Sequence, residues 1–147
     1  MSRLRDALVA AGSALPDGGN VFISVSDMHK PQVAEVARMF ADLGFKLIST
    51  SGTAQALIDA GLEVKKIPKL AEGRPNALDL LKNNEIQLVV NTPSGQSPRA
   101  DEVRIRTTAV YTNTPIMTTL SSARAVAEGI AALRKNGYSV KTIQEYH

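Results

Sequence analysis

Short apolar runs alternate with segments of helical periodicity along most of the chain. From position 20 onward, runs rich in Val, Ile, Leu and Phe are followed by segments whose apolar residues recur at helical spacing. The runs predict strands over residues 21–25, 45–49, 62–67, 86–90 and 115–117. The periodic segments predict helices over residues 31–43, 53–60, 76–83, 101–110 and 121–134. Gly44, Gly61 and Gly137 stand where helix C-caps are expected.

This repeated alternation predicts an α/β fold. Strands that alternate with helices through short connections form a parallel sheet, which the helices cover on both faces. The predicted strands are short and continuously apolar, as strands buried on both faces should be. The alternation does not determine the order of the strands in the sheet.

The first residues stand apart from this pattern. Residues 3–15 predict a short helix that Pro16 and the following Gly18-Gly19 break. Its few apolar positions suggest a connecting segment or the trimmed end of a longer region. We therefore divide the chain into a connector, residues 1–19, and a single domain with a C-terminal tail, residues 20–147.

Composition agrees with one globular domain and excludes several kinds of chemistry. The 147 residues are 44% hydrophobic and 21% charged. Because there is no Cys, disulfides, thiolate metal sites and Cys nucleophiles are excluded. His29 and His147 are too far apart for metal-ligand spacing, and we expect no metal. The sequence has no long apolar run and no signal-like start, so we expect a cytoplasmic location and no membrane contact.

The charge balance favours a small anionic ligand over a nucleic acid. The net charge is only +3, aromatic residues are 4% and there is no Trp. Nucleic-acid binders usually concentrate their basic residues on one face and add aromatic side chains for stacking. Here Lys and Arg are spread along the chain.

The residues that follow the strands carry the candidate chemistry. In open parallel sheets, ligands bind beyond the carboxyl ends of the strands. Hydroxyl groups, Gly and Lys follow the predicted strands here, and the sharpest instance is residues 50–53, Thr-Ser-Gly-Thr. Backbone N–H groups at a helix start and nearby Lys30 and Lys69 would suit a phosphate. The plainer alternative is that the hydroxyls only cap helices and the lysines are solvated.

A catalytic set is not evident. The candidate acids and bases near the strand ends are Asp27, His29, Glu72, Asp101 and Glu102. Acids at positions 101 and 102 are also favoured simply by the start of a helix. No Ser-His-Asp arrangement or carboxylate pair can be assigned, so the residues indicate binding rather than turnover.

Several motifs, in order, resemble a known family. Residues 21–27 (VFISVSD), 48–54 (ISTSGTA) and 89–95 (VVNTPSG) are similar to the methylglyoxal-synthase-like domain. Residues 72–75 (EGRP), 104–109 (RIRTTA), 118–120 (TTL) and the tail 139–145 resemble its variant at the C-terminus of the carbamoyl-phosphate synthase large subunit. The resemblance covers nearly the whole chain. It implies a Rossmann-like three-layer αβα sandwich with a five-stranded parallel sheet.

The resemblance also implies a regulatory function. In that family the domain binds a nucleotide monophosphate, UMP or IMP, as an allosteric effector, and has no cofactor or activity of its own. The parent subunit is an ATP-dependent carbon–nitrogen ligase that uses Mg²⁺ or Mn²⁺ and works with a glutamine-amidotransferase small subunit. It supplies pyrimidine and arginine biosynthesis. The domain's partners would be the effector, the rest of that enzyme and a second copy of itself.

Site residues follow by matching positions to the family motifs. Thr50, Gly52 and Thr53 would hold the phosphate, Lys30 would neutralise it, and Lys69 and Asn91 would face ribose or phosphate oxygens. The full effector-binding set comprises Lys30, Thr50, Gly52, Thr53, Lys69, Asn91, Thr92 and Ser94. Thr118 would lie on the side where some members bind ornithine.

The sequence departs from the family at three places. Pro93 replaces a Thr, which removes a hydroxyl and an N–H group. Residues 116–117, Ile-Met, stand where ornithine-responsive members carry Tyr-Asp. Gly73-Arg74 stands where methylglyoxal synthases carry a Gly-Gly pair followed by an acidic residue that serves as the catalytic base, which argues against lyase activity.

Two other functions remain as alternatives. The chain could be an enzyme of the methylglyoxal-synthase or IMP-cyclohydrolase type, since residues 24–27 resemble the start of the cyclohydrolase. It could also be an oligomerisation module with a vestigial pocket. Turnover of dihydroxyacetone phosphate and calorimetric titration with UMP and IMP separate these alternatives from a regulatory domain.

Overall fold

The computed structural model describes residues 16, 18–93 and 100–135. The predicted helix over residues 3–15, the cap at Gly137 and the site residue Ser94 lie outside this part. The strands are β1 (Asn20–Ser24), β2 (Lys46–Ser49), β3 (Val64–Lys66), β4 (Leu88–Asn91) and β5 (Ile116–Met117). The helices are α2 (Lys30–Asp42), α3 (Ser51–Asp59), α4 (Ala77–Lys82), α5 (Ala100–Tyr111) and α6 (Leu120–Lys135), and a 3₁₀ turn η1 (Asp27–His29) precedes α2.

The strands form one parallel sheet in the order β3-β2-β1-β4-β5. The central strand β1 pairs with β2 on one side and β4 on the other, so that Val21 lies opposite both Leu47 and Leu88. Strands β2 and β3 therefore extend the sheet on one side of β1, and β4 and β5 extend it on the other. Between β1 and β4 lies the switch point at which open sheets bind ligands.

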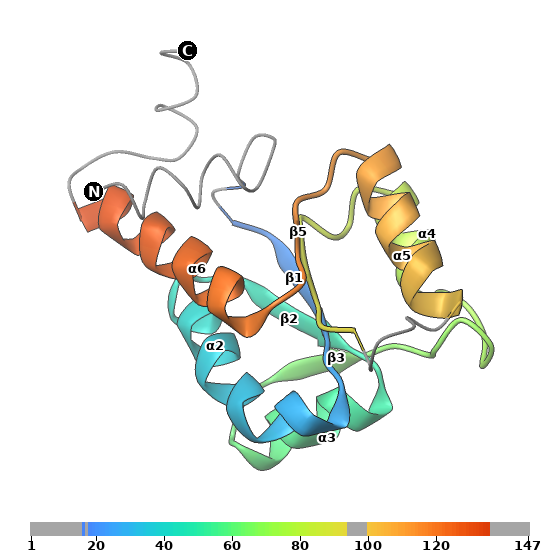
Figure 1. Cartoon of the computed structure of the whole chain (residues 1–147), viewed down its shortest axis with the longest axis horizontal. Helices are drawn as coiled ribbons and strands as arrows, with labels where there is room; N and C mark the ends of the chain where they lie inside the picture. The colour runs from blue at the N-terminus through green and yellow to red at the C-terminus, as the bar shows by residue number, and fades with distance from the viewer. Residues whose placement is uncertain (1–15, 17, 94–99, 136–147) are drawn as a thin grey trace.

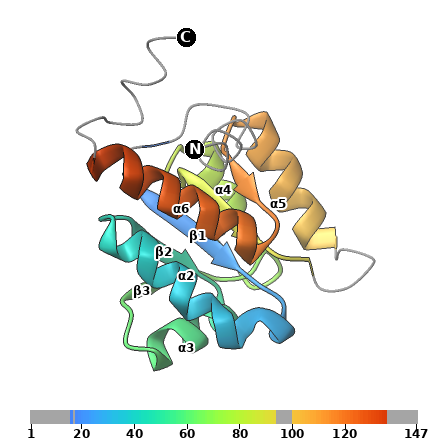
Figure 2. The same cartoon turned by 60° about the vertical axis from the view of Figure 1, so that its left-hand side comes forward.

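Helices cover both faces of the sheet (Figures 1 and 2). Because side chains alternate along a strand, Val21 and Ile23 enter one core cluster and Phe22 enters another. The first cluster includes buried residues of α2, α3 and α6, and the second those of α4 and α5. These two cores make the three-layer αβα sandwich that the sequence predicted, with its five-stranded parallel sheet.

Two boundaries differ from the sequence prediction in ways that bear on function. The helix predicted from residue 53 begins at Ser51, so Thr50 is its N-cap and Gly52 and Thr53 lie in its first turn. The strand predicted over residues 62–67 is limited to Val64–Lys66, which pair with residues 47–49 of β2. As β2 is itself short, β3 can pair only over this length.

The packing of α2 on the sheet gives a test of the fold. Phe40 is fully buried and meets Phe45 edge to face, with 5.7 Å between ring centroids. We predict that Phe40→Ala lowers the free energy of unfolding by about 3–5 kcal/mol, because it leaves a cavity in this core. Urea denaturation measures the change. Tyr111→Ala is the matched control, since Tyr111 is 86% exposed, and an equal loss in both variants would contradict the assigned core.

Candidate functional site

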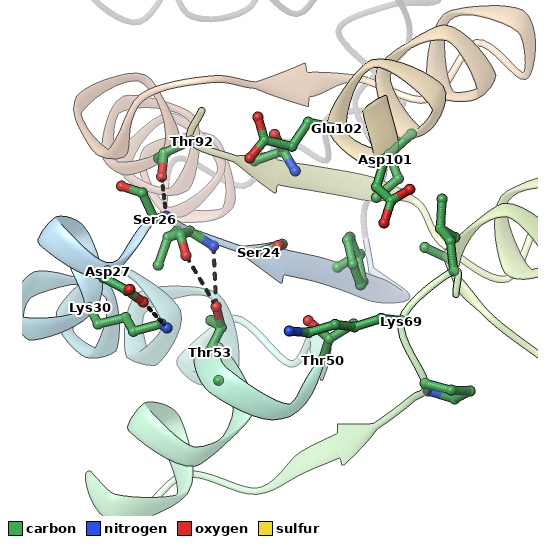
Figure 3. A pocket seen from close by; sticks show the side chains of 18 residues that line it. Ser24, Ser26, Asp27, Lys30, Thr50, Thr53, Lys69, Thr92, Asp101 and Glu102 are labelled. Atoms are coloured by element: carbon green, nitrogen blue, oxygen red, sulfur yellow. Dashed lines mark hydrogen bonds and ion pairs between the residues drawn. The ribbon is translucent and has the colours of Figure 1, made fainter. Parts of the chain in front are cut away.

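A cavity of about 280 Å³ opens at the carboxyl ends of β1, β2 and β4 (Figure 3). Residues from four strand ends and from the start of α5 surround it. It is lined by Phe22, Ser24, Val25, Ser26, Asp27, Lys30, Thr50, Gly52, Thr53, Pro68, Lys69, Leu70, Ala77, Asn91, Thr92, Asp101, Glu102 and Ile105. The sheet topology thus brings together segments that are up to about eighty positions apart in sequence.

Most of the predicted site residues meet in this cavity. Those that line it are Lys30, Thr50, Gly52, Thr53, Lys69, Asn91 and Thr92. Thr118 does not: it is exposed beyond β5. The adjacent Met117 is 4% exposed and packs in the core, so it presents no polar group to a ligand on this side.

The N-terminus of α3 forms one wall of the cavity. Thr50 is the N-cap in extended conformation, and its side chain makes no capping hydrogen bond. The first intrahelical bond runs from Ala54 N to Thr50 O, at 2.8 Å. The N–H groups of the first turn therefore lack intrahelical partners, and the positive end of the helix dipole lies beside the cavity.

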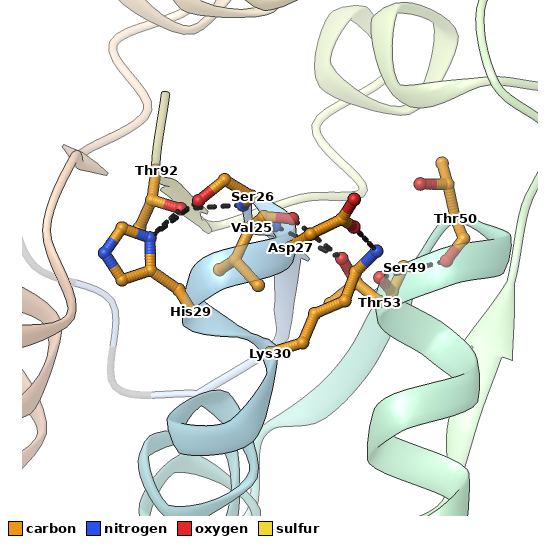
Figure 4. Close-up of polar contacts among 9 residues, drawn as sticks. All are labelled: Val25, Ser26, Asp27, His29, Lys30, Ser49, Thr50, Thr53 and Thr92. Atoms are coloured by element: carbon orange, nitrogen blue, oxygen red, sulfur yellow. Dashed lines mark hydrogen bonds and ion pairs between the residues drawn. The ribbon is translucent and has the colours of Figure 1, made fainter. Parts of the chain in front are cut away.

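Lys30 reaches this helix start from the beginning of α2 (Figure 4). Its ammonium group pairs with Asp27. A Cβ atom placed on Gly52 would lie only 2.8 Å from Lys30 Nζ. Gly52 therefore leaves room for the ammonium group beside the first turn of α3, a role distinct from the anion approach that the sequence predicted.

Two of the predicted effector-binding residues, Thr53 and Thr92, use their hydroxyl groups to hold the site together. Thr53 Oγ1 accepts from Val25 N at 3.2 Å, and Thr92 Oγ1 accepts from Ser26 N at 3.0 Å. Both threonines are at most 3% exposed. They connect the segment after β1 to α3 and to the end of β4, so a structural role accompanies any contact with a ligand.

His29 extends this network, which the sequence did not indicate. Its Nδ1 lies 2.8 Å from Ser26 Oγ and 3.2 Å from Thr92 Oγ1 (Figure 4). His29 thus connects the turn after β1 with the end of β4, across the switch point.

The opposite wall combines carboxylates with a buried amide. Asp101 and Glu102, at the start of α5, line the cavity across from Lys69 (Figure 3). Asn91 is 1% exposed, and its Oδ1 finds no hydrogen-bond partner in the part of the chain that the structure describes. A buried acceptor without a partner is costly, so this atom suits a ligand that donates a hydrogen bond.

The sequence prediction missed the apolar part of the cavity. This surface is formed by Phe22, Val25, Pro68, Leu70, Ala77 and Ile105. Phe22 could be found from strand alternation, because it points to the other face from Val21 and Ile23. The other contributions require knowledge of which helix covers which face.

The segment after β3 is fixed by ion pairing and capping. Arg74 Nη2 lies 2.6 Å from Asp79 Oδ1, and Asp79 also accepts from Asn76 N in a capping box that begins α4. The bond from Arg74, followed by that from Asn76, holds the pKa of Asp79 below its ordinary value. The ionised carboxylate consequently stabilises the fold above the unfolded-state pKa, and this contribution is lost as the pH falls through the folded-state pKa.

Gly73 and Arg74 do not line the cavity, and Arg74 instead serves the start of α4. Within residues 18–93 and 100–135, no cluster of three His, Asp or Glu side chains could hold a metal ion. In the same segments, no helix has the length and apolarity needed to cross a bilayer.

Comparison with known proteins identifies the family. A family model described as "MGS-like domain" matches residues 32–118. This chain belongs to the MGS-like domain family. A methylglyoxal synthase structure from Elizabethkingia anophelis has the same fold, with a TM-score of 0.62 and 19% identity over 77% of this chain and 79% of that one.

Curated relatives of this MGS-like domain are much longer proteins. The carbamoyl phosphate synthase large chain of Acidobacterium capsulatum is 44% identical over 96% of this chain, which spans 13% of that protein. The large chain of a Nostoc species is also 44% identical, over 95% of this chain and 13% of its own length. In Aquifex aeolicus the match is to a "C-terminal section" of the large chain, with 42% identity over 96% of this chain and 27% of that section.

The bonds made by Thr53 give a prediction about the site's architecture. We expect Thr53→Val to lower the free energy of unfolding by about 1–3 kcal/mol, because the buried Val25 N–H would lose its partner. Thermal or urea denaturation measures this. Thr50→Val should change stability by less than about 0.5 kcal/mol, because the Thr50 side chain makes no capping bond. Equal stability of the two variants would contradict the bridging role of Thr53.

Proposed function

We propose that this MGS-like domain is the regulatory domain of a carbamoyl-phosphate synthase large subunit and binds a nucleoside monophosphate effector, such as UMP or IMP. The observation that carries the proposal is the convergence of Lys30, Lys69 and the N-terminus of α3 on one cavity. The 40–44% identity to carbamoyl phosphate synthase large chains supports the choice of parent enzyme.

The phosphate would bind at the α3 wall. Unpaired N–H groups and the helix dipole favour an anion there, and the Thr50 hydroxyl is not used for capping. Lys30 and Lys69 add positive charge from two other segments. Thr53 and Thr92 would support this wall through the bonds that they make to the backbone.

The nucleoside would occupy the rest of the cavity. Ribose hydroxyl groups donate hydrogen bonds, which Asn91 Oδ1 and the carboxylates of Asp101 and Glu102 can accept. Phe22, Leu70 and Ile105 provide an apolar surface for the base. The anion-binding α3 wall alone would suit inorganic phosphate equally well, so the opposite wall is the argument for a larger ligand.

Regulation would act through the rest of the large subunit. An effector changes a distant activity only if it binds one state of the whole protein better than another, and such couplings typically amount to about 1–3 kcal/mol. In this proposal the domain itself performs no chemistry. The parent enzyme, in the cytoplasm, would carry out the ATP- and metal-dependent ligase steps with its glutamine-amidotransferase partner and would supply the pyrimidine and arginine pathways. One relative, from Oryza sativa, is named arginine-specific and chloroplastic.

We predict that Lys30→Gln and Lys69→Gln each weaken UMP or IMP binding by about 1–3 kcal/mol, or roughly 5- to 150-fold, because each removes a charged contact to the phosphate. Isothermal titration calorimetry measures the affinity. Lys46→Gln is the matched control, since Lys46 lies at the opposite, amino end of β2.

Three results would decide against the proposal. Unchanged affinity in both cavity variants would move the nucleotide site elsewhere, and no heat with either nucleotide would favour an oligomerisation module. Formation of methylglyoxal from dihydroxyacetone phosphate would instead show an enzyme, with Asp27, Asp101 and Glu102 as the carboxylates that line the cavity.

A further inference from the structure

Asp27 provides the carboxylate that pairs with Lys30 at the cavity. Its Oδ1 forms an ion pair with Lys30 Nζ, three residues further along the chain. The Asp27 side chain is 94% exposed, whereas that of Lys30 is 29% exposed. Both residues line the cavity, as Figure 3 shows. The cation is therefore held against the protein, and its acidic partner faces the solvent from which a ligand would arrive.

The position of Lys30 explains why it needs a counter-ion. An ammonium group is unfavourable beside the N-terminus of a helix, because the helix dipole presents positive charge there. Lys30 Nζ lies beside Gly52 in the first turn of α3, so close that a Cβ atom added to Gly52 would be only 2.8 Å from it. Two sources of positive potential thus meet at one point. The Asp27 carboxylate offsets both of them.

We propose that Asp27 is a built-in counter-ion that competes with the ligand's phosphate group for Lys30 and thereby weakens anion binding at this site. The inference rests on the proposed function for the identity of the ligand, but the competition itself applies to any phosphate at the α3 wall. A phosphate that contacts Lys30 must displace the carboxylate or share the ammonium group with it. In either case the two anions repel each other.

A short turn holds the carboxylate in this position. Asp27 begins η1 and Lys30 begins α2, and the backbone between them is closed by a bond from His29 N to Ser26 O at 3.0 Å. The contacts of His29 with Ser26 and Thr92 attach this turn to the end of β4. Asp27 therefore remains near Lys30 when the pair opens, which keeps it an effective competitor.

Asp27→Asn tests the competition directly. The amide is similar in size but has no charge, so the variant should bind inorganic phosphate and UMP about two- to fivefold more tightly at low salt, the scale of one exposed ion pair. High salt should reduce this gain. Asp42→Asn, at the C-terminal end of the helix that Lys30 begins, removes the same charge and should leave both affinities unchanged.

A second variant shows whether Lys30 carries the effect. In a Lys30→Gln background, Asp27→Asn should give a clearly smaller gain, because the cation for which the anions compete is absent and only the repulsion between carboxylate and phosphate is relieved. Calorimetry supplies the affinities, and phosphate-dependent shifts in melting temperature give an independent readout.

Weaker or unchanged phosphate binding in Asp27→Asn would overturn the inference, the weaker result indicating that Asp27 positions Lys30 for the ligand. Failure of UMP and IMP to bind, together with a Lys30-dependent gain for inorganic phosphate, would refute the proposed function and leave the counter-ion role standing. If UMP binds but Asp27→Asn does not alter its affinity, the counter-ion role is refuted and the proposed function stands.

Discussion

The parallel pairing of β1 with both β2 and β4 is the constraint on which the cavity depends. Because one buried strand bonds to both neighbours in parallel, the carboxyl ends of all three strands lie at the same edge. Segments that follow them are thereby brought together from distant parts of the chain. With β4 paired antiparallel, the same residues would place Asn91 at the opposite edge from Thr50 and Lys30.

Pairing alone does not shape the site, because the segments beyond the strands must also be held. Buried threonine hydroxyls supply part of this support, through Thr53 to Val25 and Thr92 to Ser26. His29 adds contacts across the switch point. These bonds connect backbone groups to side chains of neighbouring segments, so they hold the strand ends in place relative to one another.

Much of this architecture could be predicted from the sequence, because burial on two faces imposes a continuous apolar run on each strand and helical spacing between runs. The three-layer sandwich and the gathering of Lys30, Thr50 and Asn91 followed from that pattern together with the family resemblance. The strand order did not follow, since any order of parallel strands satisfies the same alternation. The length of the edge strand β3 was overestimated. Leu62 and Glu63 continue the strand-like alternation of apolar and polar residues, but the sequence does not show whether a partner strand extends beside them.

The finer features of the site depend on three-dimensional neighbours. A threonine that bonds a backbone amide, such as Thr53, has the same sequence signature as one that binds a ligand. The acids at the start of α5 are equally compatible with a solvated helix start, and only the fold places Asp101 and Glu102 at the cavity. Within residues 18–93 and 100–135, Asn91 Oδ1 has no hydrogen-bond partner, a feature that depends on everything around it and has no counterpart in the sequence.

The most direct test of the central claim is a nuclear magnetic resonance titration of the ¹⁵N-labelled protein with UMP and IMP. A ligand at the shared carboxyl edge should shift the amide signals of Ser51, Gly52 and Asn91 most strongly. The amides of Asn20, Lys46 and Leu88, at the amino ends of the same strands, should change little. Dominant shifts at the amino ends would contradict a nucleotide site at the carboxyl edge.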